Sequence, residues 1–153
     1  MRTFILLLVL VVPLPLAAGG PATDGLVRKA SPHGVGETLD RLERLLTDKG
    51  ITVALRWPHG QRAGGVDIDL RETEVMIFGN PALGSHLMTS RQTAGIDLPM
   101  KALAWRDADG QVWLAYNDPE WIAERHGIED RADVLSRMSG ALDKLTDAAI
   151  GGE

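Results

Sequence analysis

The residues best suited to chemistry in this chain are its four histidines, His33, His59, His86 and His126. The 153 residues include no cysteine, which excludes disulfides, cysteine nucleophiles, thiolate metal sites and iron–sulfur clusters. No two of the histidines have the short spacing that zinc ligands usually show. Each histidine therefore has to be considered with its own neighbours.

His59 follows an expected strand, beside Trp57, in a glycine-rich stretch. A neutral imidazole there can act as a ligand, a base or a hydrogen-bond donor, and the structural alternative is a hydrogen bond that fixes the loop. We predict that His59, Asn80, Ser85 and Tyr116 line a ligand-binding pocket. No catalytic residue is predicted. An enzymatic alternative pairs His59 with Asp97, which as a structural residue would cap a helix or form a turn.

His86 and Met88 form a His-x-Met sequence. In an extended segment both side chains would point to one side, and imidazole and thioether ligands suit copper. In a helix, residues two positions apart diverge. The prediction is accordingly that the protein has no cofactor, with a copper or redox accessory role using His86 and Met88 as the alternative.

Glycines surround the sequence Asn80-Pro81, with Gly79 before it and Gly84-Ser85 after it. This pattern predicts the start of a short helix, whose exposed N–H groups can bind anions. No Lys-Ser/Thr pair follows at the spacing of a phosphate-binding loop. The structural alternative is a tight turn in which glycine takes a positive φ.

The N-terminus has the layout of a secretory signal peptide over residues 1–19, with cleavage after Gly19 or Ala22. A positive start precedes the apolar run 4–12, and small residues follow two prolines. The run is shorter than the about 20 residues of a membrane-spanning helix. We therefore expect an exported protein, periplasmic or secreted, without membrane insertion after cleavage. The alternative is an uncleaved anchor.

The full chain is mildly acidic and has the composition of a soluble domain. Lys plus Arg number 16 and Asp plus Glu 21, for a net charge of −5, and no basic block is present. Because nucleic-acid affinity comes mainly from phosphate neutralisation, nucleic acid is not an expected partner. Residues 23–149 are predicted to form one domain, and 150–153 a frayed tail.

Periodicity predicts an α+β domain with an antiparallel sheet and helices on one face. Residues 51–57 alternate strictly, which places Ile51, Val53, Leu55 and Trp57 on one side of a strand. Residues 65–70 form either a weak strand or none. The other expected elements are strands 25–30 and 73–78, helices 35–49, 118–127 and 131–149, and a hairpin over 101–116.

The sheet is expected to be apolar on both faces. Pairing Arg106 with Gln111 in the hairpin puts Leu103, Trp105, Val112, Leu114 and Tyr116 on one face, with alanines and Trp113 on the other. Two helices cover only one face, so the other needs a cover. The candidates are the connection 80–99, a second subunit or a ligand. We predict a homodimer, with the connection contributing to the interface or to a pocket.

Several stretches together resemble the bacterial "domain of unknown function 302" family over about residues 25–146. They are residues 37–42 (ETLDRL), 49–51 (KGI), His59, 77–81 (IFGNP) with Gly84 and 87–88 (LM), 97–99 (DLP) and 112–119 (VWLAYNDP). The resemblance implies a fold like half of the TATA-binding protein: a strand, a helix, four strands and a helix. It implies no DNA binding and no particular reaction. Ser85 stands where members usually have threonine, and His86 departs from the family pattern.

Together these features predict an exported, dimeric module that binds a small ligand or a periplasmic protein. The alternative is a periplasmic metal or redox accessory protein, or an enzyme, using His59 with Asp97 or His86 with Met88.

Overall fold

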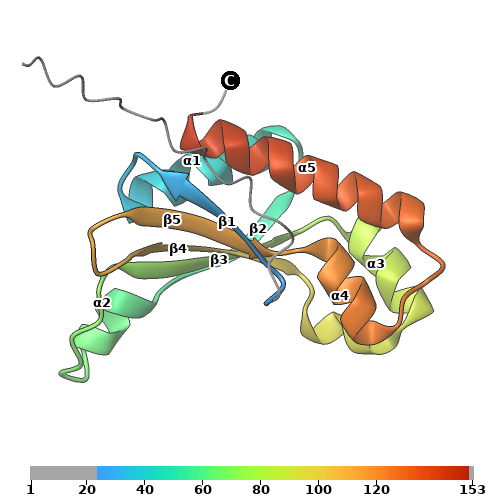
Figure 1. The fold of residues 1–153 in the computed structure, drawn as a ribbon, viewed down its shortest axis with the longest axis horizontal. Coiled ribbons are helices and arrows are strands. Elements are labelled where there is room, and N and C mark those ends of the chain that lie inside the picture. Colours follow the sequence, from blue (N-terminus) through green and yellow to red (C-terminus); the bar gives the residue numbers. More distant parts are fainter. Residues whose placement is uncertain (1–23, 152–153) are drawn as a thin grey trace, which may run out of the picture.

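The computed structural model describes residues 24–151, which form one layer of antiparallel sheet with helices packed on it (Figure 1). The expected signal peptide and the last two residues of the expected tail lie outside the described residues. The sheet is built from β1 (Leu26–Ser31), β2 (Thr52–Pro58), β3 (Thr73–Gly79), β4 (Met100–Arg106) and β5 (Val112–Asn117). Its strand order is β1-β5-β4-β3-β2, with every neighbouring pair antiparallel. The α+β prediction, with four strands after the first helix, is confirmed.

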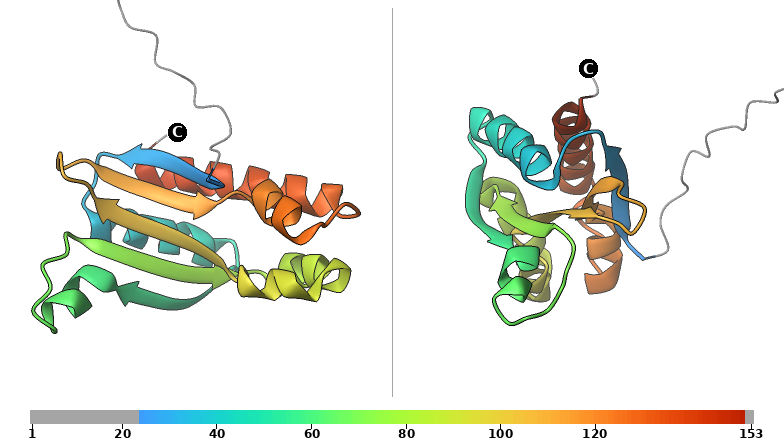
Figure 2. Two further views of the ribbon diagram at one scale, coloured as in Figure 1. Left: turned by 60° about the horizontal axis from the view of Figure 1, so that its bottom comes forward. Right: turned by 90° about the vertical axis from the view of Figure 1, so that its left-hand side faces the viewer.

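Two long helices cover one face of the sheet, α1 (Val35–Asp48) and α5 (Ala132–Ile150) (Figure 2). In α1 the residues Val35, Leu39, Leu42 and Leu46 recur at helical spacing and are at most 4% exposed, so the predicted amphipathic stripe does face the core. Helix α5 includes Ile150 and is capped by Gly151 at a φ of 95°, one residue beyond the helix end that we expected.

The remaining helices lie at the two ends of the sheet. At one end, α2 (His59–Gly64) follows β2 directly, where the glycine-rich sequence had suggested a loop. At the other end lie α3 (Pro81–Ser90), the 3₁₀ helix η1 (Gln92–Ile96) and α4 (Pro119–His126) (Figure 1). The connection 80–99 is thus largely helical, as expected, but it packs against α4 and α5 at the strand ends rather than over the second face.

A β-bulge in β2 overturns the predicted alternation of that strand. The pairing with β3 shifts between Val53 and Leu55, so that Ala54 is an extra residue. Val53 therefore packs toward the helices, whereas Leu55 and Trp57 turn to the opposite face, where they are 44% and 38% exposed. Strict alternation in a sequence cannot reveal a bulge, because a bulge changes the direction of side chains without changing their order.

The β4–β5 hairpin is one residue out of the predicted register. Asp107 pairs with Gln111 through the backbone, and Arg106 therefore lies opposite Val112 rather than Gln111. The shorter loop ends on Gly110 at a φ of 84°, a conformation that suits glycine. The Asp107 carboxylate holds the turn by accepting from the Trp113 indole at 2.7 Å and from two backbone amides, and the Trp113 hydrogen bond lowers the pKa of Asp107.

The corrected register divides the hairpin side chains differently between the two faces. Ala102, Ala104, Val112, Leu114 and Tyr116 face the helices and are buried. Leu103, Trp105 and Trp113 face the other way, and the two indoles stack with centroids 6.5 Å apart. The prediction that both faces are apolar holds, although the residues on each face differ from the predicted sets.

Candidate functional site

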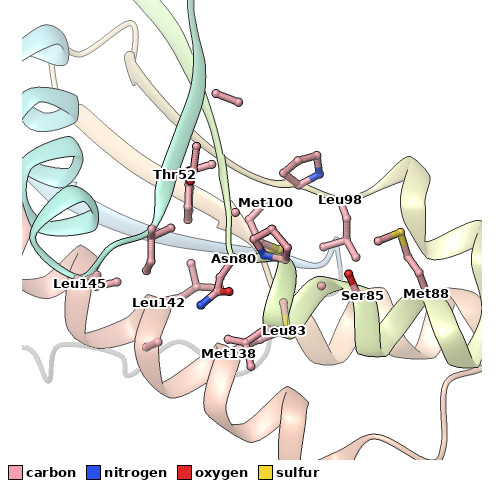
Figure 3. A pocket seen from close by; sticks show the side chains of 18 residues that line it. Thr52, Asn80, Leu83, Ser85, Met88, Leu98, Met100, Met138, Leu142 and Leu145 are labelled. Carbon is pink, nitrogen blue, oxygen red and sulfur yellow. The ribbon is translucent and has the colours of Figure 1, made fainter.

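A pocket of about 380 Å³ opens where the end of β3 meets α3 and α5 (Figure 3). The start of β2 and the segment before β4 complete its walls. The lining is apolar apart from Thr52, Asn80 and Ser85, and none of its 18 residues is charged. The apolar lining comprises Ile51, Ala54, Phe78, Gly79, Pro81, Leu83, Gly84, Met88, Leu98, Pro99, Met100, Met138, Ala141, Leu142 and Leu145.

The start of α3 places Asn80 and Ser85 at the pocket. Asn80 is the N-cap, and its Oδ1 accepts a hydrogen bond from the Ala82 amide at 2.9 Å. Pro81 follows at the first helical position, where its missing N–H costs nothing. The predicted helix start is therefore present. Gly79 does not have a positive φ. Glycine fits here because the backbone of β3 lies close to Pro99, and a Cβ at position 79 would be 3.0 Å from the Pro99 Cβ.

Asn80 and Ser85 are the two members of the predicted ligand-binding set that the structure brings together, and His59 is remote from them. His59 is an exposed residue that begins α2, beyond the last residue of β2, whereas Thr52 at the first residue of β2 lines the pocket. A strand of seven residues separates the two positions, which corresponds to about 20 Å at the usual rise per residue. His59 is therefore not a pocket residue in this structure.

Tyr116, the fourth member of the predicted set, is a core residue. It lies on the helix-facing side of β5 and is 4% exposed. Burial raises the pKa of Tyr116 to about 12, and the carboxylate of Asp143 on α5 adds to the effect. A phenol in this position packs the sheet against α5, and it is absent from the pocket lining.

His86 and Met88 diverge because the segment that carries them is helical. Met88 lines the pocket (Figure 3), whereas His86 is exposed and is not one of the lining residues. Residues two positions apart on a helix do not share a face. Among residues 24–151, no three His, Cys, Asp or Glu side chains gather closely enough to hold a metal ion.

Asp97 does contact a histidine, but the partner is His126 of α4 rather than His59. The His126 Nε2 lies 2.7 Å from the Asp97 Oδ2, and its Nδ1 lies 3.0 Å from the Thr93 hydroxyl. Arg125 adds a longer contact of 3.3 Å to the same carboxylate. Asp97 is 8% exposed, so this cluster joins η1 to α4 in a largely buried position. It also fixes the residue that precedes Leu98 and Pro99 of the pocket.

Replacing His126 with leucine should destabilise the protein by about 1–3 kcal/mol, because the Asp97 carboxylate loses its shortest side-chain hydrogen bond in a buried position. The measurement is the free energy of unfolding from urea denaturation. His86→Leu is the control, since His86 is exposed and its substitution should change stability by less than about 0.5 kcal/mol. Equal effects of the two substitutions would show that the Asp97–His126 contact adds nothing to stability.

The sequence alone did not identify the α5 residues that line the pocket, and the reason is physical. Met138, Leu142 and Leu145 recur at helical spacing in α5 and are indistinguishable in sequence from residues of the core. Whether such a stripe packs against a neighbour or borders a cavity depends on how far α3 stands from it. The sequence did contain one indication of the pocket. Asn80-Pro81 marks the start of a helix, and the nearby glycines Gly79 and Gly84 indicate that another segment packs closely against the backbone there.

Curated relatives match 84% of this chain at 44% identity over 129 residues. They are proteins named fluoride-specific ion channel FluC 1 from Brucella suis biovar 1 (strain 1330) and from Brucella abortus biovar 1 (strain 9-941). The match covers 51% and 48% of these relatives, respectively. This chain therefore spans about half their length. Over residues 24–151, no helix combines the length and the apolar character needed to cross a bilayer.

A crystal structure of an uncharacterized conserved DUF302 protein from Bacillus stearothermophilus has the same fold. Its TM-score to this chain is 0.66 at 16% sequence identity, and the match covers 82% of this chain and 95% of that protein. The family model described as "Domain of unknown function DUF302" matches residues 27–145. The fold and the family match agree with each other over nearly all the described residues, and the chain belongs to the DUF302 family.

Proposed function

We propose that this protein is an exported binding module that takes a neutral, largely apolar small molecule into the pocket between β3, α3 and α5. The observation that carries the proposal is a cavity of about 380 Å³ whose lining has no charged residue. Ligand sites are typically concave and apolar with a few placed polar groups. Thr52, Asn80 and Ser85 are the groups available to orient a polar end of such a ligand.

The neutral lining also sets the preference among ligands of similar size. An ionised carboxylate or ammonium group would lose its hydration in the pocket without gaining an ion pair, which is costly. A buried methylene contributes about 0.8 kcal/mol. We therefore infer that an uncharged molecule with an apolar chain or ring binds better than its charged analogue, and that any charged end of a ligand stays at the mouth.

Titration with the neutral fluorescent probe N-phenyl-1-naphthylamine tests this proposal. We expect saturable binding of one probe per chain, and stronger displacement of the probe by decanol than by decanoate. Native mass spectrometry of the gently purified protein would report a retained ligand in the same preparation. Absence of saturable binding up to the solubility limit of the probe, with no retained mass, would overturn the proposal.

Export is a separate part of the proposal and rests on residues 1–22 of the sequence. Cell fractionation and the intact mass of the purified protein test it, since cleavage after Gly19 or Ala22 leaves a defined N-terminus. A cytoplasmic protein that retains Met1 or Arg2 would contradict it. Fluoride conduction is not proposed for this chain, because the relatives that carry that name are about twice as long.

A further inference from the structure

One face of the sheet is apolar and is covered by neither α1 nor α5, although α2 lies against it beside β2, where Arg62 stacks over the Trp57 ring at 3.5 Å. We call this the open face, and it lies opposite α1 and α5 (Figures 1 and 2). The stacked pair Trp105 and Trp113 lies on it, and the bulge at Ala54 adds Leu55 and Trp57, which are 44% and 38% exposed. The open face consists of Leu55, Trp57, Val75, Ile77, Leu103, Trp105, Trp113 and Ala115.

A second uncovered apolar surface projects from the end of β2. Residues 59–72, which we call the arm, comprise α2 and the loop that follows, and they extend from the sheet on the side of the open face (Figure 1). Val66, Ile68 and Leu70 alternate along this loop and are 66%, 59% and 45% exposed. Exposed apolar side chains that gather in this way often mark a surface for a partner.

We infer that a second copy of this chain covers the open face, with the arm of each copy lying over the sheet of the other. The size of the surface supports a dimer. Four strands about 4.8 Å apart, with about 3.3 Å per residue over six or seven residues, present roughly 400 Å² in projection. Two such faces give roughly 800 Å², and the two arms, with Val66, Ile68 and Leu70 exposed, supply the remainder of the about 1,200 Å² at the lower end of stable interfaces.

Charge also favours a copy of the chain over a charged partner. The protein has a net charge of −5, and a two-fold interface brings like surfaces together, so charged faces would repel. On β2 to β5 the side chains of the open face are neutral except Lys101, which lies at the end remote from the arm, whereas β1 adds Arg28, which lies opposite Ala115 and pairs with Asp24. The arm carries Asp67 and Asp69 between its apolar residues, and Arg62, Arg71 and Glu72 lie nearer to the sheet.

These charges indicate the direction of pairing. If the two-fold axis is perpendicular to the strands, each arm lies over the Lys101 end of the partner sheet. The Asp67 and Asp69 carboxylates of the arm then approach the Lys101 ammonium group of the other copy. The apolar side chains then pack as two stacked sheets do. An axis parallel to the strands would instead bring the Asp67 and Asp69 carboxylates of the two arms together, which like-charge repulsion disfavours.

The test is sedimentation equilibrium of the purified protein and of three variants, each adding one carboxylate. Leu55→Glu places it on the open face, Ile68→Glu on the arm and Thr47→Glu on the exposed surface of α1, the control. We expect a dimer for the unmodified protein and for the control. Leu55→Glu and Ile68→Glu should each raise the dissociation constant by roughly 100-fold, because an unpaired carboxylate would be buried.

A monomer at concentrations up to about 100 µM would overturn the inference, and so would a dimer whose dissociation constant neither Leu55→Glu nor Ile68→Glu changes. An effect of Leu55→Glu alone would support the pairing of sheets and overturn the role of the arm. Circular dichroism checks that Leu55→Glu folds. Ile68 is 59% exposed, so the arm variant tests the interface without disturbing the core.

Discussion

An Ala141→Trp variant should bind N-phenyl-1-naphthylamine at least tenfold more weakly than the unmodified protein. Ala141 lies on α5 in the pocket wall between Met138 and Leu145, and an indole at this position projects into a cavity of about 380 Å³. Displacing the equivalent of two methylene groups of the ligand, at about 0.8 kcal/mol each, already weakens binding by roughly tenfold. Fluorescence titration of the two proteins gives the ratio of dissociation constants.

The matched control is Ala82→Trp, which adds the same side chain to an exposed position of α3 outside the pocket lining. This variant should bind the probe as the unmodified protein does. The melting temperature of Ala141→Trp distinguishes a filled pocket from a lost fold. It should stay close to that of the unmodified protein, because an indole that fills an existing cavity does not require the core to expand. A folded Ala141→Trp protein with unchanged affinity would show that the probe binds elsewhere.

Replacing Arg56 with methionine should lower the free energy of unfolding by about 2–3 kcal/mol. The guanidinium Nε lies 2.8 Å from the Glu74 Oε1, and Nη1 contacts Asp40 at 2.5 Å and Glu43 at 3.1 Å. Glu74 is only 18% exposed, so the variant leaves a carboxylate without its cation under α1. Burial by itself lowers the pKa of Arg56, but hydrogen bonds to these three acids outweigh burial and raise the pKa overall.

Urea denaturation measures the free energy of unfolding of Arg56→Met, and Arg106→Met is the variant with which it is compared. Arg106 pairs with Glu72 at 2.8 Å, but both side chains are well exposed, so its loss should cost less than about 1 kcal/mol. Adding Glu74→Gln to Arg56→Met should recover part of the lost stability, because it removes the uncompensated charge. Equal losses for the two arginine variants would mean that burial of Glu74 does not strengthen the Arg56 cluster.

Local patterns were sufficient for most of the secondary structure. The amphipathic stripe of α1, the Asp118-Pro119 start of α4 and the continuous apolar run of β3 each depend on side chains within a few residues of one another, and each is where we expected it. The missed element is α2, whose six residues HGQRAG include two glycines and no apolar stripe. A helix of this kind depends on its neighbours, here the cation–π contact of Arg62 with the Trp57 ring at 3.5 Å.

The candidate site was only half predictable. Asn80 and Ser85 were found because a helix start has a local signature, whereas His59 and Tyr116 were grouped with them on residue type. Asp97 was chosen as the partner of a histidine, but the contact that forms is with His126, 29 positions along the chain. Sequence separation of this size carries no information on which pair meets.

By itself the sequence determined the α+β class, the order of the elements and the presence of apolar residues on both faces of the sheet, because these follow from composition and short-range periodicity. Only the tertiary structure decided which residues share a face and which enclose a cavity. The bulge at Ala54 turned Leu55 and Trp57 outward, and a one-residue change in the hairpin loop placed Trp105 and Trp113 together. The pocket arises because residues near positions 51, 80, 99 and 138 meet at one end of the sheet, and such meetings are decided by packing between distant segments.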